Sequence, residues 1–218
     1  MRKIIFIIFI LLIILITIFK VDASYTVFPL LGKTIVLDAG HGLPDFGASV
    51  GNVKESEVNL LITLKLKDIL EKEGAVVLLT REDENDLADD KALYRKKSDF
   101  DRRIKIINNS NADLYLSIHQ NIYSNKIYKG PQVFYDSKLK DNEKIAETLQ
   151  NDLNSFTKNN RKIKIISGTY MYNKLNVKGV LIECGFLSNP DEKSKLLSED
   201  YQKNFVKTIT NSIIRYFS

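Results

Sequence analysis

Short apolar runs alternate along this chain with longer stretches in which apolar residues recur at every third or fourth position. The short runs are typical of buried strands, and the longer period is typical of amphipathic helices. Strands are predicted in the run that leads to residue 119 and at residues 33–37, 75–80, 132–135, 162–166, 169–172 and 179–182. Helices are predicted in a pattern that ends near residue 108 and at residues 56–73, 139–156 and 199–217. Strands separated by helices predict a single α/β domain, whose mainly parallel, twisted sheet of about six strands has helices on both faces.

The N-terminal segment departs from this alternation. Residues 4–19 are almost wholly apolar and are flanked by basic residues on both sides. Such a run is typical of an export signal, because a comfortable membrane span needs about 20 apolar residues. We expect residues 1–23 to form a signal peptide or a retained membrane anchor, residues 24–32 a linker, and residues 33–218 a folded domain outside the cytoplasm. A buried core helix is the alternative for the apolar run.

The charge balance and the cysteine usage narrow the classes of function. The 218 residues contain 32 Lys and Arg against 27 Asp and Glu, a net charge of +5. This excess indicates only mild attraction to anionic surfaces, and we expect no nucleic-acid partner, because nucleic-acid binding leaves a stronger basic footprint. Cys184 is the single cysteine, so no intrachain disulfide can form and the fold must rest on its hydrophobic core.

The chain has only two histidines, and both stand at the ends of predicted strands. His41 follows the first buried strand in a loop that holds three of the ten glycines, and His119 follows another strand. Since the carboxyl ends of parallel strands converge on one crevice, both imidazoles are expected there, where they would suit a divalent metal. The glycines allow the backbone to turn tightly beside a ligand.

Two carboxylates are placed to complete such a site. Glu183 directly follows an apolar run, and Glu55 lies between the His41 loop and the first predicted helix. Two imidazoles and one carboxylate form a zinc set that leaves a position for water, and a second carboxylate can then move protons. The chain supplies this count, with Glu183 as the base and the ligands His41, Glu55 and His119. Structural alternatives stay open, namely a paired carboxylate for Glu183 and a helix-terminal charge for Glu55.

Four segments, in order along the chain, resemble the motif blocks of the zinc-dependent N-acetylmuramoyl-L-alanine amidases of the amidase-3 type. They are residues 37–42 (LDAGHG), 54–60 (KESEVNL), 117–121 (SIHQN) and 182–189 (IECGFLSN). The resemblance extends from residue 33 to residue 217. It implies that residues 33–218 form an amidase catalytic domain, which hydrolyses the amide bond between N-acetylmuramic acid and L-alanine in peptidoglycan.

Residue by residue, the resemblance implies one Zn²⁺ per chain, bound by His41, Glu55 and His119. Glu183 would be the catalytic carboxylate, which takes a proton from the attacking water and passes it to the departing L-alanine nitrogen. Asn121 and Arg81 also occupy family positions and are candidate substrate contacts, Arg81 for a substrate carboxylate. A structural ion pair is the alternative for Arg81.

Within the family, the chain most resembles the short spore-cortex amidases that prepare muramic-δ-lactam, which links it to sporulation and germination. The grounds are the single N-terminal apolar segment, the lack of wall-binding repeats, residues 129–135 (KGPQVFY) and the compact C-terminal helix. A vegetative wall or cell-separation amidase would share the same catalytic residues. In either case we expect an exported enzyme at the interface of cell wall and membrane or between the forespore membranes. An uncleaved N-terminal segment would bind the membrane, and an accessory or activating protein could position the enzyme on peptidoglycan.

Two other classes of function stay open. A cysteine hydrolase could pair Cys184 with His119, but its thiolate would need an electropositive, partly exposed setting. The position of Cys184 after a buried strand favours a small core residue instead. The other alternative is a non-catalytic wall-binding module with the same fold.

Overall fold

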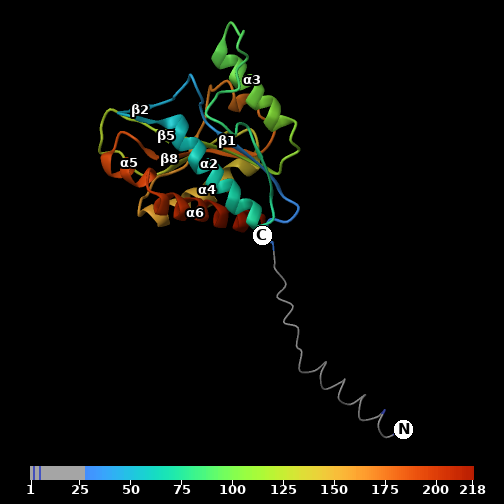
Figure 1. The fold of residues 1–218 in the computed structure, drawn as a ribbon. Helices are drawn as coiled ribbons and strands as arrows, with labels where there is room; N and C mark the ends of the chain where they lie inside the picture. Colours follow the sequence, from blue (N-terminus) through green and yellow to red (C-terminus); the bar gives the residue numbers. More distant parts are fainter. Residues whose placement is uncertain (1, 3–4, 6–27) are drawn as a thin grey trace.

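The computed structural model describes Arg2, Ile5 and residues 28–218, whose fold is shown in Figure 1. The predicted signal peptide or anchor, residues 1–23, lies outside the described residues apart from those two. Among the residues that are described, no helix combines the length and the apolar character that a membrane crossing requires. Leu30 is fully buried, and its N–H donates to the Glu73 carbonyl at 2.9 Å, so the end of the predicted linker packs with the folded domain.

A six-stranded sheet forms the centre of the molecule, in the strand order β4-β1-β5-β8-β6-β7. The strands are β1 Thr34–Ala39, β4 Val76–Leu79, β5 Leu114–Asn121, β6 Gln132–Tyr135, β7 Lys164–Ile165 and β8 Gly179–Phe186. All neighbouring strands are parallel except β6 and β8. The central strands β1, β5 and β8 are buried over most of their length because both faces of the sheet are covered. The predicted α/β domain with a mainly parallel sheet is confirmed.

Helices cover both faces of the sheet, as predicted, but unequally (Figure 1). One face carries α2 Glu55–Lys72, α4 Lys140–Thr157 and α6 Glu199–Phe217. The apolar stripe of α2 consists of Val58, Ile62, Leu66 and Leu70, each at most 1% exposed. Each such side chain stabilises the fold by about 1.5–3 kcal/mol when it is fully buried. The main hydrophobic core therefore lies on this face, where these helices meet the strands.

The opposite face of the sheet is covered by α3 Arg95–Asn108 and by the segment that contains the 3₁₀ helix η1 Tyr172–Lys174. Its smaller core consists of Val36, Ile107, Tyr115, Met171, Tyr172, Leu175 and Leu181. The buried residues of α3 are Asp99, Arg103 and Ile107, so two of the three are charged. This helix is therefore held against the sheet by ionic contacts as well as by apolar packing.

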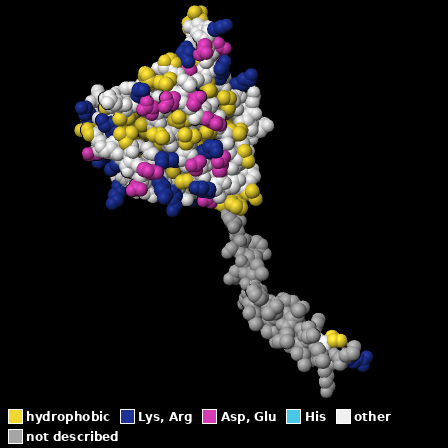
Figure 2. All heavy atoms as spheres, viewed as in Figure 1, with side chains coloured by type: hydrophobic (Ala, Val, Ile, Leu, Met, Phe, Trp, Pro, Cys, Tyr) yellow, Lys and Arg dark blue, Asp and Glu magenta, His cyan; other side chains and the backbone are white. Residues whose placement is uncertain are grey.

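The loop before α3 projects from the body of the domain (Figure 1). At this projection Leu93 is 87% exposed and Tyr94 is 71% exposed. Elsewhere, acidic and basic side chains are interspersed over the face that Figure 2 shows, with apolar side chains between them. This mixture agrees with the modest net charge of +5.

Three local elements differ from the sequence prediction. Residues 169–172 form a turn and the first residue of η1 and not the predicted strand, because the chain curls back and the Asn173 N–H donates to the Thr169 carbonyl at 3.2 Å. The short helix α5 Pro190–Leu196 has no predicted counterpart, although Asn189 caps its first turn and Pro190 favours its start. The hairpin of β2 Ser49–Val50 and β3 Val53–Lys54, which precedes α2, is likewise absent from the prediction.

Candidate active site

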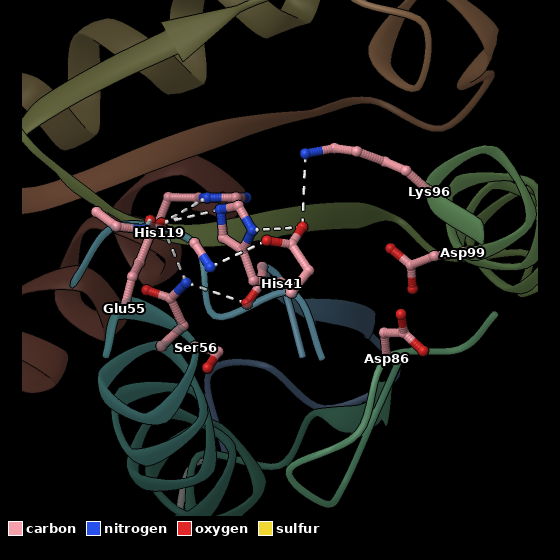
Figure 3. A network of polar contacts seen from close by, with 12 residues as sticks. His41, Glu55, Ser56, Asp86, Lys96, Asp99 and His119 are labelled. Atoms are coloured by element: carbon pink, nitrogen blue, oxygen red, sulfur yellow. Dashed lines mark hydrogen bonds and ion pairs between the residues drawn. The ribbon is translucent and has the colours of Figure 1, made fainter. Parts of the chain in front are cut away.

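The carboxyl edge of the sheet brings together three side chains from distant parts of the chain (Figure 3). His41 lies two residues beyond β1, His119 lies within β5, and Glu55 is the first residue of α2. Each residue offers one potential metal-ligand atom, and these three atoms all lie within 4.8 Å of one another. Parallel pairing of β1 with β5 sets this arrangement, because the two strands reach the same edge of the sheet.

Glu183 lies beside this cluster on the neighbouring strand. It is the register partner of His119 where β5 pairs with β8. Both strands continue past these residues, so His119 and Glu183 lie inside strands. The sequence predicts both residues just beyond a strand end, and this placement is wrong. The backbone pairing persists through the polar residues at this edge, where the Leu187 N–H still donates to the Asn121 carbonyl at 2.9 Å. His41, His119 and Glu183 line one cavity of about 200 Å³.

Glu55 is 4% exposed and lies at the centre of the cluster. Its Oε1 lies 3.0 Å from His119 Nδ1 and 3.4 Å from His41 Nε2. The backbone N–H groups of Gln120 and Ala48 donate to its two oxygens at 3.1 and 2.9 Å. Burial alone would raise the pKa of Glu55, but the hydrogen bonds with His119 and His41 outweigh it and hold the pKa well below its usual range. The carboxylate is therefore ionised and fixed in position at neutral pH.

A second carboxylate, Asp45, orients His41. The Nδ1 atom of His41 lies 3.0 Å from Asp45 Oδ2, while its Nε2 atom faces Glu55. Histidine ligands of metals commonly hold their second ring nitrogen against a carboxylate in this way. Burial lowers the pKa of His41, but the hydrogen bonds to Glu55 and Asp45 reverse the shift and raise it. Asp45 is not among the predicted site residues, although an acidic residue four positions after a histidine in a glycine-rich loop is a usable signal.

Two glycines of the His41 loop make room for the cluster. A Cβ on Gly40 would lie 2.2 Å from the His119 ring, and a Cβ on Gly47 would lie 2.5 Å from Glu55 Oε2. Gly47 also has a φ of 65°, a left-handed value that favours glycine. The backbone of this loop therefore approaches the cluster more closely than any other residue type would allow.

Glu183 differs from Glu55 in its lack of a charged partner. Its Oε2 is buried, and no group in the described part of the chain forms a hydrogen bond with that oxygen. Burial raises the pKa of Glu183 to about 7, and the charge of Glu55 adds to the shift while the nearby histidines oppose it. The alternative role for Glu183 is that of a structural carboxylate paired with a lysine or arginine. No such partner lies at this oxygen in the described residues.

The two residues considered for substrate contact lie in different settings. Arg81 is only 3% exposed, and its guanidinium donates to the carbonyls of Ala39, Gly40, Ser56 and Asp83. This bonding favours a structural role for Arg81, with backbone carbonyls in place of the expected ion pair. Asn121 is half-buried at the end of β5, and its contact with substrate stays a prediction.

The donor set fits a divalent metal ion. Two imidazole nitrogens and one ionised carboxylate are grouped within 4.8 Å, beside a cavity. Such a set with an open fourth position is typical of a hydrolytic metal site. Glu183 lines the same cavity with an oxygen that has no partner in the described part of the chain, and a carboxylate in that position can move protons.

Sequence comparison places this site in a known family. A profile of the Amidase_3 family, described as N-acetylmuramoyl-L-alanine amidase, matches residues 35–215. The chain belongs to this family. The amidase is 42% identical over 194 residues to the germination-specific N-acetylmuramoyl-L-alanine amidase of Bacillus subtilis strain 168, which covers 87% of this chain and 82% of the relative. The resemblance carried by the four sequence segments is therefore confirmed, and with it the class of enzyme.

Solved structures share the fold of this amidase. The CwlD amidase from Clostridioides difficile, solved in complex with the GerS lipoprotein, matches with a TM-score of 0.81 at 38% identity, over 84% of this chain and 98% of that chain. An N-acetylmuramoyl-L-alanine amidase from Clostridium difficile 630 matches with a TM-score of 0.74 at 28% identity, over 84% of this chain and 96% of that chain. The α/β architecture described above is thus that of the family.

The raised pKa of Glu183 predicts how the stability of the metal-free amidase depends on pH. From pH 4.5 to about 7, the folded protein binds a proton at Glu183 that the unfolded chain has lost. Stability from this group is therefore fully present below pH 4.5 and is lost as the pH rises through about 7. At pH 8 the ionised carboxylate destabilises the fold by at most about 3 to 4 kcal/mol, since the pKa is raised from 4.5 to about 7 and one pKa unit corresponds to about 1.4 kcal/mol.

We therefore expect Glu183→Gln to raise the Tm of the chelator-treated amidase at pH 8 and to change it little at pH 5, because a protonated carboxyl and an amide are similar in charge and shape. Thermal denaturation of both proteins at both pH values measures the difference. An equal gain in Tm at pH 5 and pH 8 would contradict the raised pKa.

Proposed function

We propose that this amidase binds one zinc ion per chain through His41, Glu55 and His119 and uses Glu183 as the proton-transferring carboxylate. The observation that carries the proposal is the grouping of three donor atoms within 4.8 Å beside the cavity that Glu183 also lines. The family match supports the reaction, which is hydrolysis of the amide bond between N-acetylmuramic acid and L-alanine in peptidoglycan. A protein that only bound the cell wall, without catalysis, would not need the buried Glu183 Oε2 beside that cluster to lack a partner among the described residues.

The residues divide the work of the reaction between them. When bound, zinc would act as a Lewis acid that lowers the pKa of water toward neutrality and polarises the lactyl carbonyl of the substrate. Glu55 stays ionised, and two backbone N–H donors keep its oxygens in place against the histidines. Asp45 fixes the ring of His41. Glu183 accepts a proton from the attacking water and passes it to the departing L-alanine nitrogen, since no group among the described residues forms a hydrogen bond with its buried Oε2.

We infer that the biological setting is the spore cortex, where removal of stem peptides prepares muramic-δ-lactam. The 42% identity to a germination-specific amidase supports this setting, as does the similarity to CwlD. The enzyme then works outside the cytoplasm, at the membrane if its N-terminal segment is retained. Because CwlD was solved with a lipoprotein, we include an accessory protein among the partners of this chain. A vegetative wall or cell-separation amidase with the same chemistry is the alternative.

Digestion of purified peptidoglycan tests this proposal. The full-length protein is incubated with cortex-type and vegetative glycan, with and without a chelator, and the products are identified by mass. We expect free stem peptides that begin with L-alanine, which disappear on chelation and return with added zinc. Cleavage of another bond would overturn the reaction, and activity that persists without metal would overturn the zinc centre. Faster release from vegetative wall than from cortex-type glycan would favour the alternative setting.

The cysteine-hydrolase alternative leads to a separate prediction. Cys184 is fully buried in the main core, and burial raises the pKa of its thiol, so a reactive thiolate is disfavoured. We expect Cys184→Ser to release stem peptides within about twofold of the unaltered rate, with a lower Tm because a hydroxyl enters the core. A folded Cys184→Ser variant that has lost its activity would support the cysteine mechanism instead.

A further inference from the structure

Two arginines from distant parts of the chain converge on the backbone that carries His41. Arg81 Nε and Arg103 Nη1 both donate to the Ala39 carbonyl, at 2.8 and 2.7 Å. Arg81 Nη2 also donates to the Gly40 carbonyl at 3.0 Å. Arg103 Nη2 donates to the His41 carbonyl at 2.6 Å. Three consecutive carbonyls at the end of β1 are thus held by two guanidinium groups.

This stretch of backbone has a conformation that needs support. His41 has a φ of 61°, in the left-handed region, although it is not a glycine. That region costs a residue with a Cβ roughly 1–2 kcal/mol, and it persists only where surrounding contacts impose it. With this turn, His41 Nε2 lies 3.4 Å from Glu55 Oε1. The turn therefore decides whether the imidazole meets the other two proposed ligands.

Arg103 is itself held in place by two buried carboxylates, Asp99 and Asp38. It comes from α3 and is 1% exposed. Its Nε atom donates to the two oxygens of Asp99 at 3.0 and 2.9 Å, and its Nη1 atom donates to Asp38 Oδ1 at 2.7 Å. Asp38 in turn accepts hydrogen bonds from the hydroxyls of Thr80 and Ser117 at 2.7 and 2.6 Å. The guanidinium is therefore confined to one position relative to β1.

Attachment of α3 to the sheet would not by itself need this arrangement. One arginine paired with Asp38 and Asp99 would hold the helix, whereas a second buried cation beside the first one adds a desolvation cost and a repulsion. Arg81 and Arg103 nevertheless share the Ala39 carbonyl. The Arg81 guanidinium adds hydrogen bonds to the turn that positions His41. This turn is the structure that both arginines contact, so it is the feature that their pairing stabilises.

We propose that Arg81 and Arg103 form a carbonyl clamp, which holds the left-handed turn at His41 and thereby presents its imidazole to the metal. The proposal rests on the metal-binding function proposed above. It assigns both arginines to the positioning of a ligand. Neither arginine then needs to contact substrate, so the clamp acts on metal affinity before it acts on turnover.

The test weakens the clamp without altering a proposed ligand. Asp99→Asn keeps the shape of the side chain that locks Arg103 but removes its charge. Asp86→Asn is the matched control, because Asp86 forms a similar pair with Arg95 of the same helix, at 3.0 and 2.8 Å, and within the described structure neither residue forms a hydrogen bond with the three carbonyls. The zinc affinity of each full-length variant is measured by competition with a chromophoric chelator, and its Tm is measured without metal.

We expect Asp99→Asn to weaken zinc binding about tenfold or more, the usual cost of losing an outer partner of a metal ligand, and Asp86→Asn to change it less than about twofold. Equal zinc affinities of the two variants would overturn the clamp, whatever their Tm values. Failure of the unaltered protein to bind zinc would overturn the proposed metal centre as well, which separates the two proposals.

Arg81→Lys supplies a second measurement that does not depend on how Asp99→Asn folds. A lysine keeps the positive charge but cannot donate to two carbonyls in the fixed geometry of a guanidinium. Zinc affinity is expected to fall, and the visible absorption of the cobalt(II)-loaded variant is expected to shift as His41 changes its position. Unchanged zinc affinity and an unchanged cobalt spectrum in folded Arg81→Lys would overturn the proposal.

Discussion

Glu183→Ala is expected to retain its zinc and to release stem peptides at least about 100-fold more slowly than the unaltered amidase, because general acid–base catalysis commonly contributes this much or more. Glu183 lines the cavity, but the grouped potential ligand atoms belong to three other residues, so the proposed metal binding is not expected to depend on it. Its buried oxygen is free to accept a proton. Zinc content by atomic spectroscopy and stem-peptide release by mass spectrometry measure the two quantities separately.

Two further variants sharpen this prediction. Glu183→Gln keeps the shape of the side chain but cannot accept a proton, so it is expected to be as slow as Glu183→Ala. Glu147→Ala removes an exposed carboxylate of α4 and is the control, with activity close to that of the unaltered protein. Turnover retained by Glu183→Gln, or zinc lost from Glu183→Ala, would assign a different role to this carboxylate.

Glu55→Gln is expected to lower zinc affinity by more than about 100-fold, since even outer partners of metal ligands cost 10–100-fold when they are changed. Both oxygens of Glu55 accept backbone hydrogen bonds, from Gln120 and Ala48. A glutamine would turn an N–H₂ group toward one of these donors and would carry no charge to offset the metal. Activity at limiting zinc is therefore expected to be lost together with the metal.

The control for this variant is Glu57→Gln, in the same first turn of α2. Glu57 pairs with Lys54 at 3.0 Å, and its side chain is 44% exposed, so it offers the same substitution at the surface. Its zinc affinity and stem-peptide release are expected to match those of the unaltered amidase. Zinc affinity measured by chelator competition decides the matter: an unchanged affinity in Glu55→Gln would remove Glu55 from the ligand set.

The main elements of the fold could be predicted because each carries its own periodicity. The stripe of α2 and the apolar run of β1 are visible without knowledge of their neighbours. Residues 169–172 show where this reasoning fails. Met171 and Tyr172 are buried, as a strand would bury them, but they pack as a turn in the smaller core. Their apolar character reflects burial alone, so the sequence pattern cannot distinguish a buried turn from a buried strand.

The candidate site divides in the same way. Histidines are rare in this chain, so His41 and His119 draw attention by their type and position. The chain has seven arginines, and nothing in the spacing distinguishes the buried Arg103 from its neighbour Arg102, which pairs with Asp89 at the surface at 3.3 Å. The function of such a residue depends on its partners, and these lie far away in the sequence.

The sequence by itself determined the α/β class, the family, and the residue types from which a hydrolytic metal centre can be built, because hydrophobic period and motif residues are local properties of the chain. Only the tertiary structure decided that Asp45 contacts His41, that Glu183 Oε2 is buried without a partner among the described residues, and that the Arg81 guanidinium donates to backbone carbonyls. Apart from the contact of Asp45, these features depend on distances between segments that are far apart along the chain. No local pattern records such distances, because they arise only when the strands align at one edge of the sheet.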